Sequence, residues 1–235
     1  MTFRALSAEM DLTPEVPFAL PWVHAAGQPY IDWLLGGRAA AVRALERWMS
    51  RPSSEVFIGR AVLLLVGTRP VGGFIALHGE ELARCRMQDA LAAVAATPPE
   101  QRSALISRLK AGHSLFEDVS PDELYLSRMG VLAAARGRGY GRAIVLEHLQ
   151  HGMQRGFRRF SLDVWAGNTA AIRLYESVGF HREARYRSDA GGMTYLRMAH
   201  DVPAEQEHET RDPSARPTRS SFSATGRPRK AWIRF

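Results

Sequence analysis

Residues 131–142 carry the residue types that bind a phosphorylated ligand. Glycines and arginines alternate along this segment: Arg136, Gly137, Arg138, Gly139, Gly141 and Arg142. Glycine permits tight, partly left-handed backbone geometry and lets an anion approach main-chain N–H groups. The helix expected to follow adds the unpaired amides and the dipole of its first turn, and the arginines add formal charge. The segment therefore favours a pyrophosphate, with an exposed glycine-rich turn as the plainer interpretation.

Position excludes two common phosphate-binding loops. A Walker A loop needs Gly-Lys followed by Ser or Thr, whereas Gly141 is followed by Arg142. The dinucleotide fingerprint needs a third glycine where Arg142 stands, and an acidic ribose ligand about twenty residues further on. Residues 157–160 contain no acidic residue. The pyrophosphate is therefore expected to belong to another kind of cofactor.

A second informative segment is residues 162–180, which read LDVWAGNTAAIRLYESVGF. Together with Arg136-x-x-Gly139-x-Gly141, it resembles the paired motifs of the GNAT superfamily of acyl-CoA-dependent N-acetyltransferases: Asn-x-x-Ala, then Leu-Tyr and Gly-Phe. The resemblance covers residues 123–200 and is strongest to the branch that acetylates the N-terminus of a ribosomal protein.

The resemblance implies that acetyl-CoA is the co-substrate. Its pantetheine arm is expected to enter between two strands that splay apart, with the pyrophosphate on the amides of the glycine loop. The residues assigned to cofactor binding in this way are Met129, Gly130, Val131, Arg136, Gly137, Arg138, Gly139, Tyr140, Gly141, Arg142 and Asn168.

Two catalytic residues are also implied. Tyr175 matches the tyrosine that protonates the leaving thiolate, and Asp163 matches a glutamate that serves as the base. Aspartate is one methylene shorter, which favours a water relay. Asp122 and Glu123 are alternative bases. A base matters because about one lysine ε-amine in a thousand is neutral at pH 7, against about 10–20% of α-amines. A packed core tyrosine and a half-solvated strand aspartate are the structural alternatives.

The acceptor is expected to be a primary amine on a peptide, a protein or a small molecule. The motif resemblance favours a peptide or protein amine, and the long insertion described below weighs against it. An acidic run, Glu117, Asp118, Asp122 and Glu123, either attracts a cationic amine or is a solvated loop. A module that binds acyl-CoA or nucleic acid without turnover is the alternative from another class.

The pattern of elements predicts an α/β fold, a mixed central sheet flanked by helices. Strands are expected at 61–67, 71–78, 123–131 (with an irregularity), 159–165, 180–187 and 193–200, and helices at 37–49, 81–96, 100–111, 139–155 and 168–178. The helical pair forms an insertion at about 80–120, between 71–78 and 123–131, which correspond to strands three and four of the GNAT-like sheet that the resemblance implies. One domain is expected over 1–200, followed by a flexible basic tail at 201–235 that is rich in Pro, Ser and Thr.

Composition limits the kinds of partner and the cellular location to be expected. The 235 residues include 31 Lys and Arg against 24 Asp and Glu, and this net charge of +7 suggests an anionic partner. The single cysteine, Cys85, is expected in the core and excludes a disulfide scaffold. No apolar run would span a membrane and no secretory signal is visible, so a cytoplasmic protein is expected. His148 and His151 are interpreted as surface residues without a third metal ligand. Neither a metal nor a nucleic-acid partner is expected.

Overall fold

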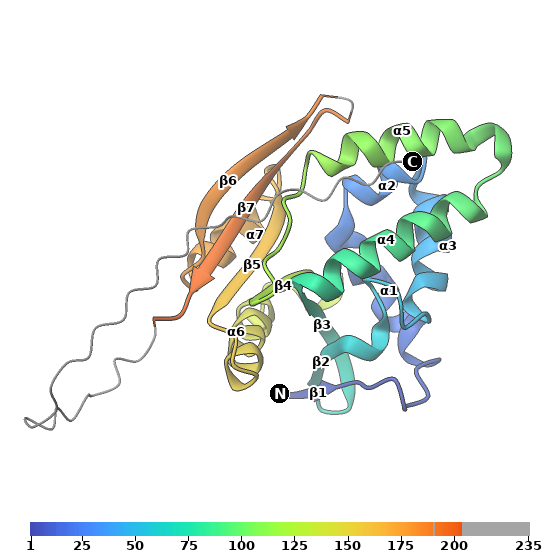
Figure 1. Cartoon of the computed structure of the whole chain (residues 1–235). Helices are drawn as coiled ribbons and strands as arrows, with labels where there is room; N and C mark the ends of the chain where they lie inside the picture. The colour runs from blue at the N-terminus through green and yellow to red at the C-terminus, as the bar shows by residue number, and fades with distance from the viewer. Residues whose placement is uncertain (190, 204–235) are drawn as a thin grey trace, which may run out of the picture. The chain divides into compact units, whose positions relative to one another are not determined.

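The structure is a computed structural model that describes residues 1–189 and 191–203. Seven strands form one mixed sheet in the order β1-β2-β3-β4-β5-β7-β6 (Figure 1). The strands are β1 (Thr2–Ala5), β2 (Ala61–Val66), β3 (Arg69–His78), β4 (Glu123–Val131), β5 (Arg159–Trp165), β6 (His181–Ser188) and β7 (Met193–Asp201). β4 and β5 are parallel, and every other neighbouring pair is antiparallel. The predicted α/β fold is confirmed.

Helices cover both faces of the sheet. They are α1 (Glu15–Gly27), α2 (Tyr30–Leu34), α3 (Arg38–Met49), α4 (Gly79–Ala96), α5 (Pro99–His113), α6 (Tyr140–Gln154) and α7 (Thr169–Glu176), with short 3₁₀ turns η1 (Ile58–Arg60) and η2 (Ala133–Ala135). The sheet separates two hydrophobic cores, because alternate residues of a strand face opposite sides. Leu63 and Ile75 pack with α1, α3 and α4 in one core. Leu64 and Phe74 pack with α6 and α7 in the other.

The helical insertion lies where it is predicted, because α4 and α5 connect β3 to β4. Pro99 occupies the first turn of α5, a position at which the missing proline N–H costs nothing. Arg108 Nε on α5 donates to the carbonyl oxygen of Leu34 on α2 at 2.7 Å, and Figure 1 shows these two helices side by side. The far end of α5 reaches the β6–β7 hairpin, where Ser188 Oγ donates to the carbonyl oxygen of Ala111 at 3.4 Å.

The N-terminal elements β1, α1 and α2 are not predicted by the sequence analysis. α1 contains Pro21 in its interior, which obscures the helical pattern. The helix is held by packing, because Ala19, Trp22 and Val23 are buried in the core. At the other end of the domain, β7 extends to Asp201, one residue into the predicted tail; residues 204–235 lie outside the described residues.

β4 and β5 pair only at their beginnings, in three pairs from Glu123–Arg159 to Tyr125–Ser161. Beyond Tyr125 they separate, and this opens a gap in the middle of the sheet. The β3–β4 register shifts at the same place, leaving Ser127 as an extra residue. Such a bulge bends its strand, so the predicted irregularity in β4 is confirmed and helps β4 leave β5.

The prediction of a surface position for His148 is wrong. His148 is fully buried on α6, with its ring centroid 5.4 Å from those of Phe74 and Phe160. Burial lowers the pKa of His148 to about 3, so the imidazole is neutral in the folded protein. The spacing of Ile144, Val145, His148 and Leu149 places all four on one apolar face of α6. Cys85 is buried as predicted.

Candidate active site

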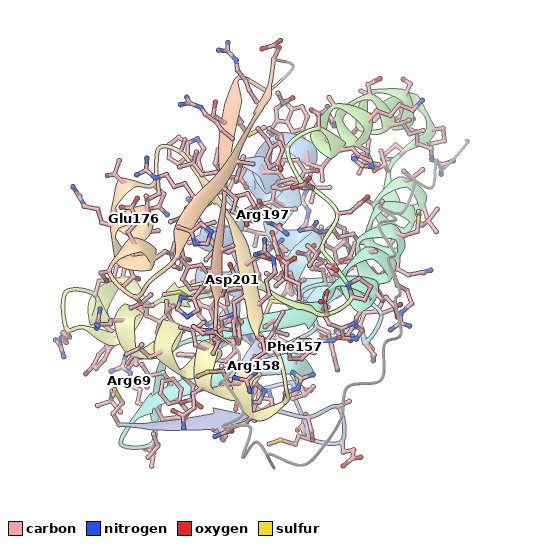
Figure 2. The ribbon with its side chains drawn as sticks, turned by 60° about the vertical axis from the view of Figure 1, so that its left-hand side comes forward. Arg69, Phe157, Arg158, Glu176, Arg197 and Asp201 are labelled. Carbon is pink, nitrogen blue, oxygen red and sulfur yellow. The ribbon has the colours of Figure 1, made fainter. Side chains whose placement is uncertain are left out.

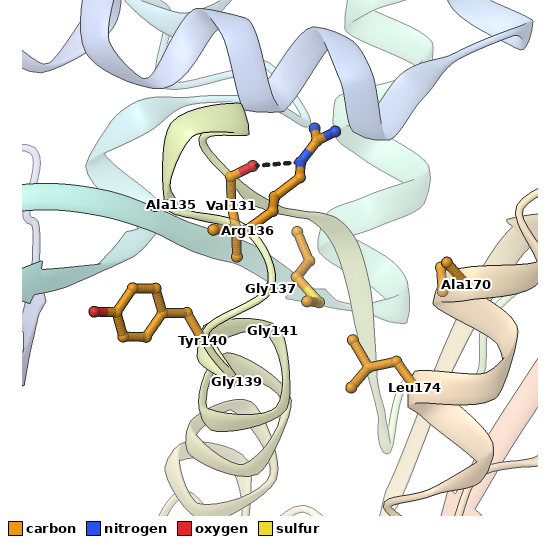
Figure 3. A pocket seen from close by; sticks show the side chains of 11 residues that line it. Val131, Ala135, Arg136, Gly137, Gly139, Tyr140, Gly141, Ala170 and Leu174 are labelled. Atoms are coloured by element: carbon orange, nitrogen blue, oxygen red, sulfur yellow. Dashed lines mark hydrogen bonds between the residues drawn. The ribbon is translucent and has the colours of Figure 1, made fainter.

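A pocket of about 290 Å³ lies between the end of β4, the glycine loop, and the first turns of α6 and α7 (Figure 3). Its lining residues are Met129, Val131, Ala135, Arg136, Gly137, Gly139, Tyr140, Gly141, Ala170, Ala171 and Leu174. Seven of the eleven cofactor residues expected from sequence line this pocket. Gly130, Arg138 and Arg142 do not, and Asn168 belongs to the adjoining pocket described below.

The glycines of the loop serve two different purposes. Gly137 and Gly139 have φ angles of 76° and 79°, the left-handed region that favours glycine. Space is tight at Gly141, because a Cβ there would lie 3.1 Å from Leu174 Cδ2 on α7 and the leucine side chain would have to shift slightly. Within the described chain, no hydrogen bond is made by the backbone N–H groups of residues 137–142. The loop therefore presents consecutive free donors at the start of a fifteen-residue helix.

The arginines around the loop are exposed and do not all turn toward the pocket. Arg136 Nε donates to the carbonyl oxygen of Val131 at 3.1 Å, the bond drawn in Figure 3. Arg142 Nη1 donates to the carbonyl oxygen of Ser177, beyond α7, at 3.0 Å. Arg138 is exposed. Their positive charge surrounds the loop.

A second pocket, of about 110 Å³, fills the gap between β4 and β5. It shares Met129, Ala171 and Leu174 with the first pocket, so the two adjoin. Its other lining residues are Ala26, Gln28, Leu126, Ser127, Leu162, Asp163, Val164, Trp165, Asn168 and Tyr175. The structure thus brings both candidate catalytic residues, Asp163 and Tyr175, and the cofactor candidate Asn168 into one pocket.

Asn168 caps the helix that carries Tyr175. Its side-chain Oδ1 accepts a hydrogen bond from the backbone N–H of Ala171 at 3.2 Å, which satisfies one of the free donors in the first turn of α7. Removal of this cap would loosen the turn that places Tyr175 in the pocket.

Tyr175 is buried on α7, with its hydroxyl 3.7 Å from the sulfur of Met129. Burial raises the pKa of Tyr175 to about 12. The phenol therefore keeps its proton at neutral pH and is able to donate it. Its ring packs against Phe180, with 5.8 Å between the centroids. Tyr175 therefore packs in the core, as the structural alternative expected, and also lines the pocket.

Asp163 is held by one of its two carboxylate oxygens. Oδ2 accepts from the Tyr125 hydroxyl at 3.0 Å and from Arg197 Nη1 at 3.1 Å, while Oδ1 has no partner in the part of the chain that is described. The side chain is 1% exposed, and this burial raises the pKa of Asp163. Arg197, Arg86 and the hydrogen bond from Tyr125 oppose that rise. The geometry orients the carboxylate and leaves Oδ1 unpaired.

The alternative bases lie elsewhere. Glu123 is buried and accepts from Arg197 Nη2 at 3.0 Å, with Arg159 Nε 3.6 Å away. Asp122 is exposed and accepts from the Ser120 hydroxyl. Neither lines the two pockets. Glu117, the first residue of the acidic run, accepts from the Tyr186 hydroxyl at 2.6 Å.

Several residues of the second pocket are absent from the sequence analysis. Gln28 follows α1, where no sequence period points to it, and its Nε2 donates to Asp32 at 2.7 Å. The sequence pattern could have indicated Trp165, because it follows Asp163 by two residues on a strand and so projects from the same face of the sheet. Its side chain is 41% exposed. No sequence pattern could have indicated Arg86 and Arg197, because both lie near Asp163 in space and far from it in the sequence.

Two features are absent from the described residues. None of the helices in residues 1–189 and 191–203 is both long and apolar enough to cross a membrane. In the same part of the chain, no three His, Cys, Asp or Glu side chains gather closely enough to hold a metal ion.

The sequence matches the model of the Acetyltransferase (GNAT) family over residues 33–180. A mycothiol acetyltransferase from Thermobispora bispora is 48% identical over 60 residues, which are 26% of this chain and 20% of that protein. The N-alpha-acetyltransferase 40 of Saccharomyces cerevisiae is 40% identical over 81 residues, 32% of this chain and 28% of that protein. The chain therefore spans between 20% and 28% of the length of these two relatives.

Solved structures agree over most of the chain. An N-acetyltransferase from Staphylococcus aureus Mu50 has a TM-score of 0.63 at 18% identity, covering 85% of this chain and 100% of that one. A ribosomal-protein-alanine N-acetyltransferase from Brucella melitensis has a TM-score of 0.51 at 16% identity, covering 86% of this chain and 100% of that one. At these identities the likeness shows the fold.

Proposed function

The chain belongs to the Acetyltransferase (GNAT) family, and on that premise we propose that it is an acyl-CoA-dependent N-acetyltransferase that moves an acetyl group from acetyl-CoA to a primary amine. One observation carries the proposal. Asp163 and Tyr175 line one pocket in the gap between β4 and β5, beside the pocket of the glycine loop. A base, an acid and an anion site are therefore arranged along one path.

The residues present fit acetyl-CoA. The N–H groups of residues 137–142 would hold the pyrophosphate, because none of them bonds to another group of the described chain and two glycines leave the backbone uncovered. Beyond Tyr125, the backbone of β4 on the side of β5 has no partner strand among the described residues. That edge is suited to an extended pantetheine arm, which would lie along Met129, Gly130 and Val131. Bound acetyl-CoA would supply the thioester carbonyl that the amine attacks.

Asp163 would take the proton of the acceptor amine. Among the described residues Oδ1 has no partner, whereas Oδ2 is held by two donors, and the side chain lines the pocket. The rise in the pKa of Asp163 caused by burial makes this carboxylate a stronger base than an exposed aspartate. The short side chain favours transfer through one water molecule. Tyr175 would donate its hydroxyl proton toward the sulfur, since its pKa of about 12 keeps it protonated.

For the acceptor, we propose a peptide or protein amine. The 81-residue match to the yeast N-alpha-acetyltransferase 40 supports this class. A small-molecule amine is the second candidate, supported by the match to a mycothiol acetyltransferase and by the insertion. Phe116, which follows α5, packs edge-on against Tyr30 and Tyr195, with 4.9 and 5.2 Å between ring centroids. This contact ties α2 to the β6–β7 hairpin.

The test is the release of free thiol from acetyl-CoA on mixing the protein with a panel of amines, with mass detection of products. The panel contains peptides with free N-termini, the same peptides blocked at the N-terminus but carrying lysine, and small alkylamines. Acetylated product that disappears in Asp163→Asn would support the proposal. Binding of acetyl-CoA without thiol release from any amine would favour a non-catalytic module.

A further inference from the structure

Tyr125 connects the candidate base to two arginines. It lies on β4 at the last residue pair before the strands separate, and its hydroxyl donates to Asp163 Oδ2 at 3.0 Å. The guanidinium carbons of Arg86 and Arg197 lie 5.0 and 5.4 Å from the centroid of its ring. Cations at this distance are attracted to the ring and favour its hydroxyl as a donor.

Arg86 comes from the insertion, on the second turn of α4, and is anchored at its far side. Its Nε is 3.5 Å from Oε2 of Glu55, and its guanidinium lies 5.5 Å from the ring centroid of Phe116. Glu55 is buried, and its Oε1 accepts from the Ser127 hydroxyl at 2.7 Å. Since Ser127 is the bulged residue of β4, the bulge, the buried carboxylate and Arg86 form one connected group.

Arg197 completes the support from the opposite side. It projects from β7 beside β5 (Figure 2) and is directly opposite Asp163 in the strand register. Its two terminal nitrogens donate to Asp163 at 3.1 Å and to Glu123 at 3.0 Å. Asp163 Oδ2 is thus fixed from β4 and from β7, and the insertion acts on it through Tyr125.

We propose that Arg86 and Tyr125 are positioning residues, which hold Asp163 by its Oδ2 in the wall of the pocket between β4 and β5, so that the insertion helix α4 is part of the catalytic apparatus. The proposal rests on the proposed function, in which Asp163 is the base. It gives the insertion a role in proton transfer, separate from any contact with the acceptor.

The groups around Asp163 set the direction of the expected pH effect. The charged or titratable groups that face it are Tyr125 on β4, Arg86 on α4, Tyr195 and Arg197 on β7, Tyr186 on β6 and Tyr175 on α7. Arg86 and the Tyr125 hydrogen bond both favour the ionised carboxylate. Removal of either therefore raises the pKa of Asp163 and leaves less of the base ionised in acid.

The test measures kcat/KM from pH 5 to pH 9 for wild type, Tyr125→Phe and Arg86→Met, with one amine acceptor. The ratio of variant to wild type cancels the ionisation of the acceptor. We expect a loss of about tenfold at the acidic end, shrinking to less than about twofold at the alkaline end. Arg86→Lys, which keeps the charge, should restore much of the acidic activity. Arg84→Ala, an exposed residue on the same helix, is the control and should leave the profile unchanged.

A readout without turnover complements the rates. The protonated Asp163 carboxyl has a carbonyl infrared band, which is isolated as the difference between a protein and the same protein carrying Asp163→Asn. In the Tyr125→Phe background this band should disappear at a higher pH than in the wild-type background. A loss of the same factor at every pH, or an unshifted infrared titration, would overturn the proposal while leaving the activity intact. No acetyl transfer by wild type, or full activity in Asp163→Asn, would instead overturn the proposed function.

Discussion

Arg197 lies directly opposite Asp163 in the pairing of β5 with β7, and its Nη1 donates to Asp163 Oδ2 at 3.1 Å. The same guanidinium donates to Glu123 Oε1, so one buried cation serves two buried carboxylates. Arginine is suited to this position because its rigid fork of donors satisfies both partners at once. A buried carboxylate without this cation would have to bind a proton or leave the core.

Loss of that cation should therefore destabilise the whole domain. We expect Arg197→Met to lower the free energy of unfolding by about 3–5 kcal/mol, because the substitution leaves uncompensated charges in the core. Chemical denaturation followed by circular dichroism measures this change. Arg187→Met is the matched control, since Arg187 is 75% exposed and should change stability by less than about 0.5 kcal/mol. Equal stability of the two variants would contradict the assignment.

Gly139 should be more sensitive to a side chain than its open surroundings suggest. A Cβ there contacts nothing within 4 Å, but the φ angle of 79° is strained for any other residue by about 1–2 kcal/mol. Gly139→Ala is expected to shift the loop and to weaken acetyl-CoA binding about tenfold, as measured by calorimetry. Gly67→Ala, with a φ angle of 61° in the β2–β3 turn, carries similar strain away from the pocket and should bind acetyl-CoA as wild type does.

Tyr175 should affect turnover and not binding. Tyr175→Phe keeps the ring that packs on Phe180 and removes only the proton donor. We expect kcat to fall about a hundredfold with an unchanged Kd for acetyl-CoA. Because the pKa of Tyr175 is about 12, the wild-type rate should not fall through ionisation of this tyrosine below about pH 10. An unchanged kcat in the variant would exclude Tyr175 as the acid.

The buried His148 should make the protein sensitive to acid. Its pKa is lowered to about 3 in the folded state and returns to about 6.5 on unfolding, so the unfolded chain binds the proton more readily. The contribution to stability is therefore lost as pH falls from about 6.5 toward 3. His148→Leu removes this dependence. The difference in unfolding free energy between variant and wild type should grow in favour of the variant as pH falls, and a difference that is constant with pH would contradict this account.

The strands and helices after residue 37 were predictable because their signals are local. The continuous apolar run of β2 and the helical spacing in α6 depend on neighbours within a few residues, and Gly137 and Gly139 stand where the backbone needs positive φ. The same spacing in α6 already placed His148 with Ile144 and Val145 on the buried face. By contrast, Pro21 contradicted the helical pattern of α1, and only packing against the sheet made that helix stable.

The sequence by itself determined the family motifs, the glycine loop and the order of the elements after residue 37, since each depends on residues adjacent in the chain. Only the tertiary structure decided how Asp163 is held, because its partners Tyr125 and Arg197 lie 38 and 34 residues away. The Ser127–Glu55 contact spans 72 residues, and Arg86 reaches the site from an inserted helix. Strand register and burial bring these groups together, and they turn an ordinary strand aspartate into a buried carboxylate that is held by one of its oxygens.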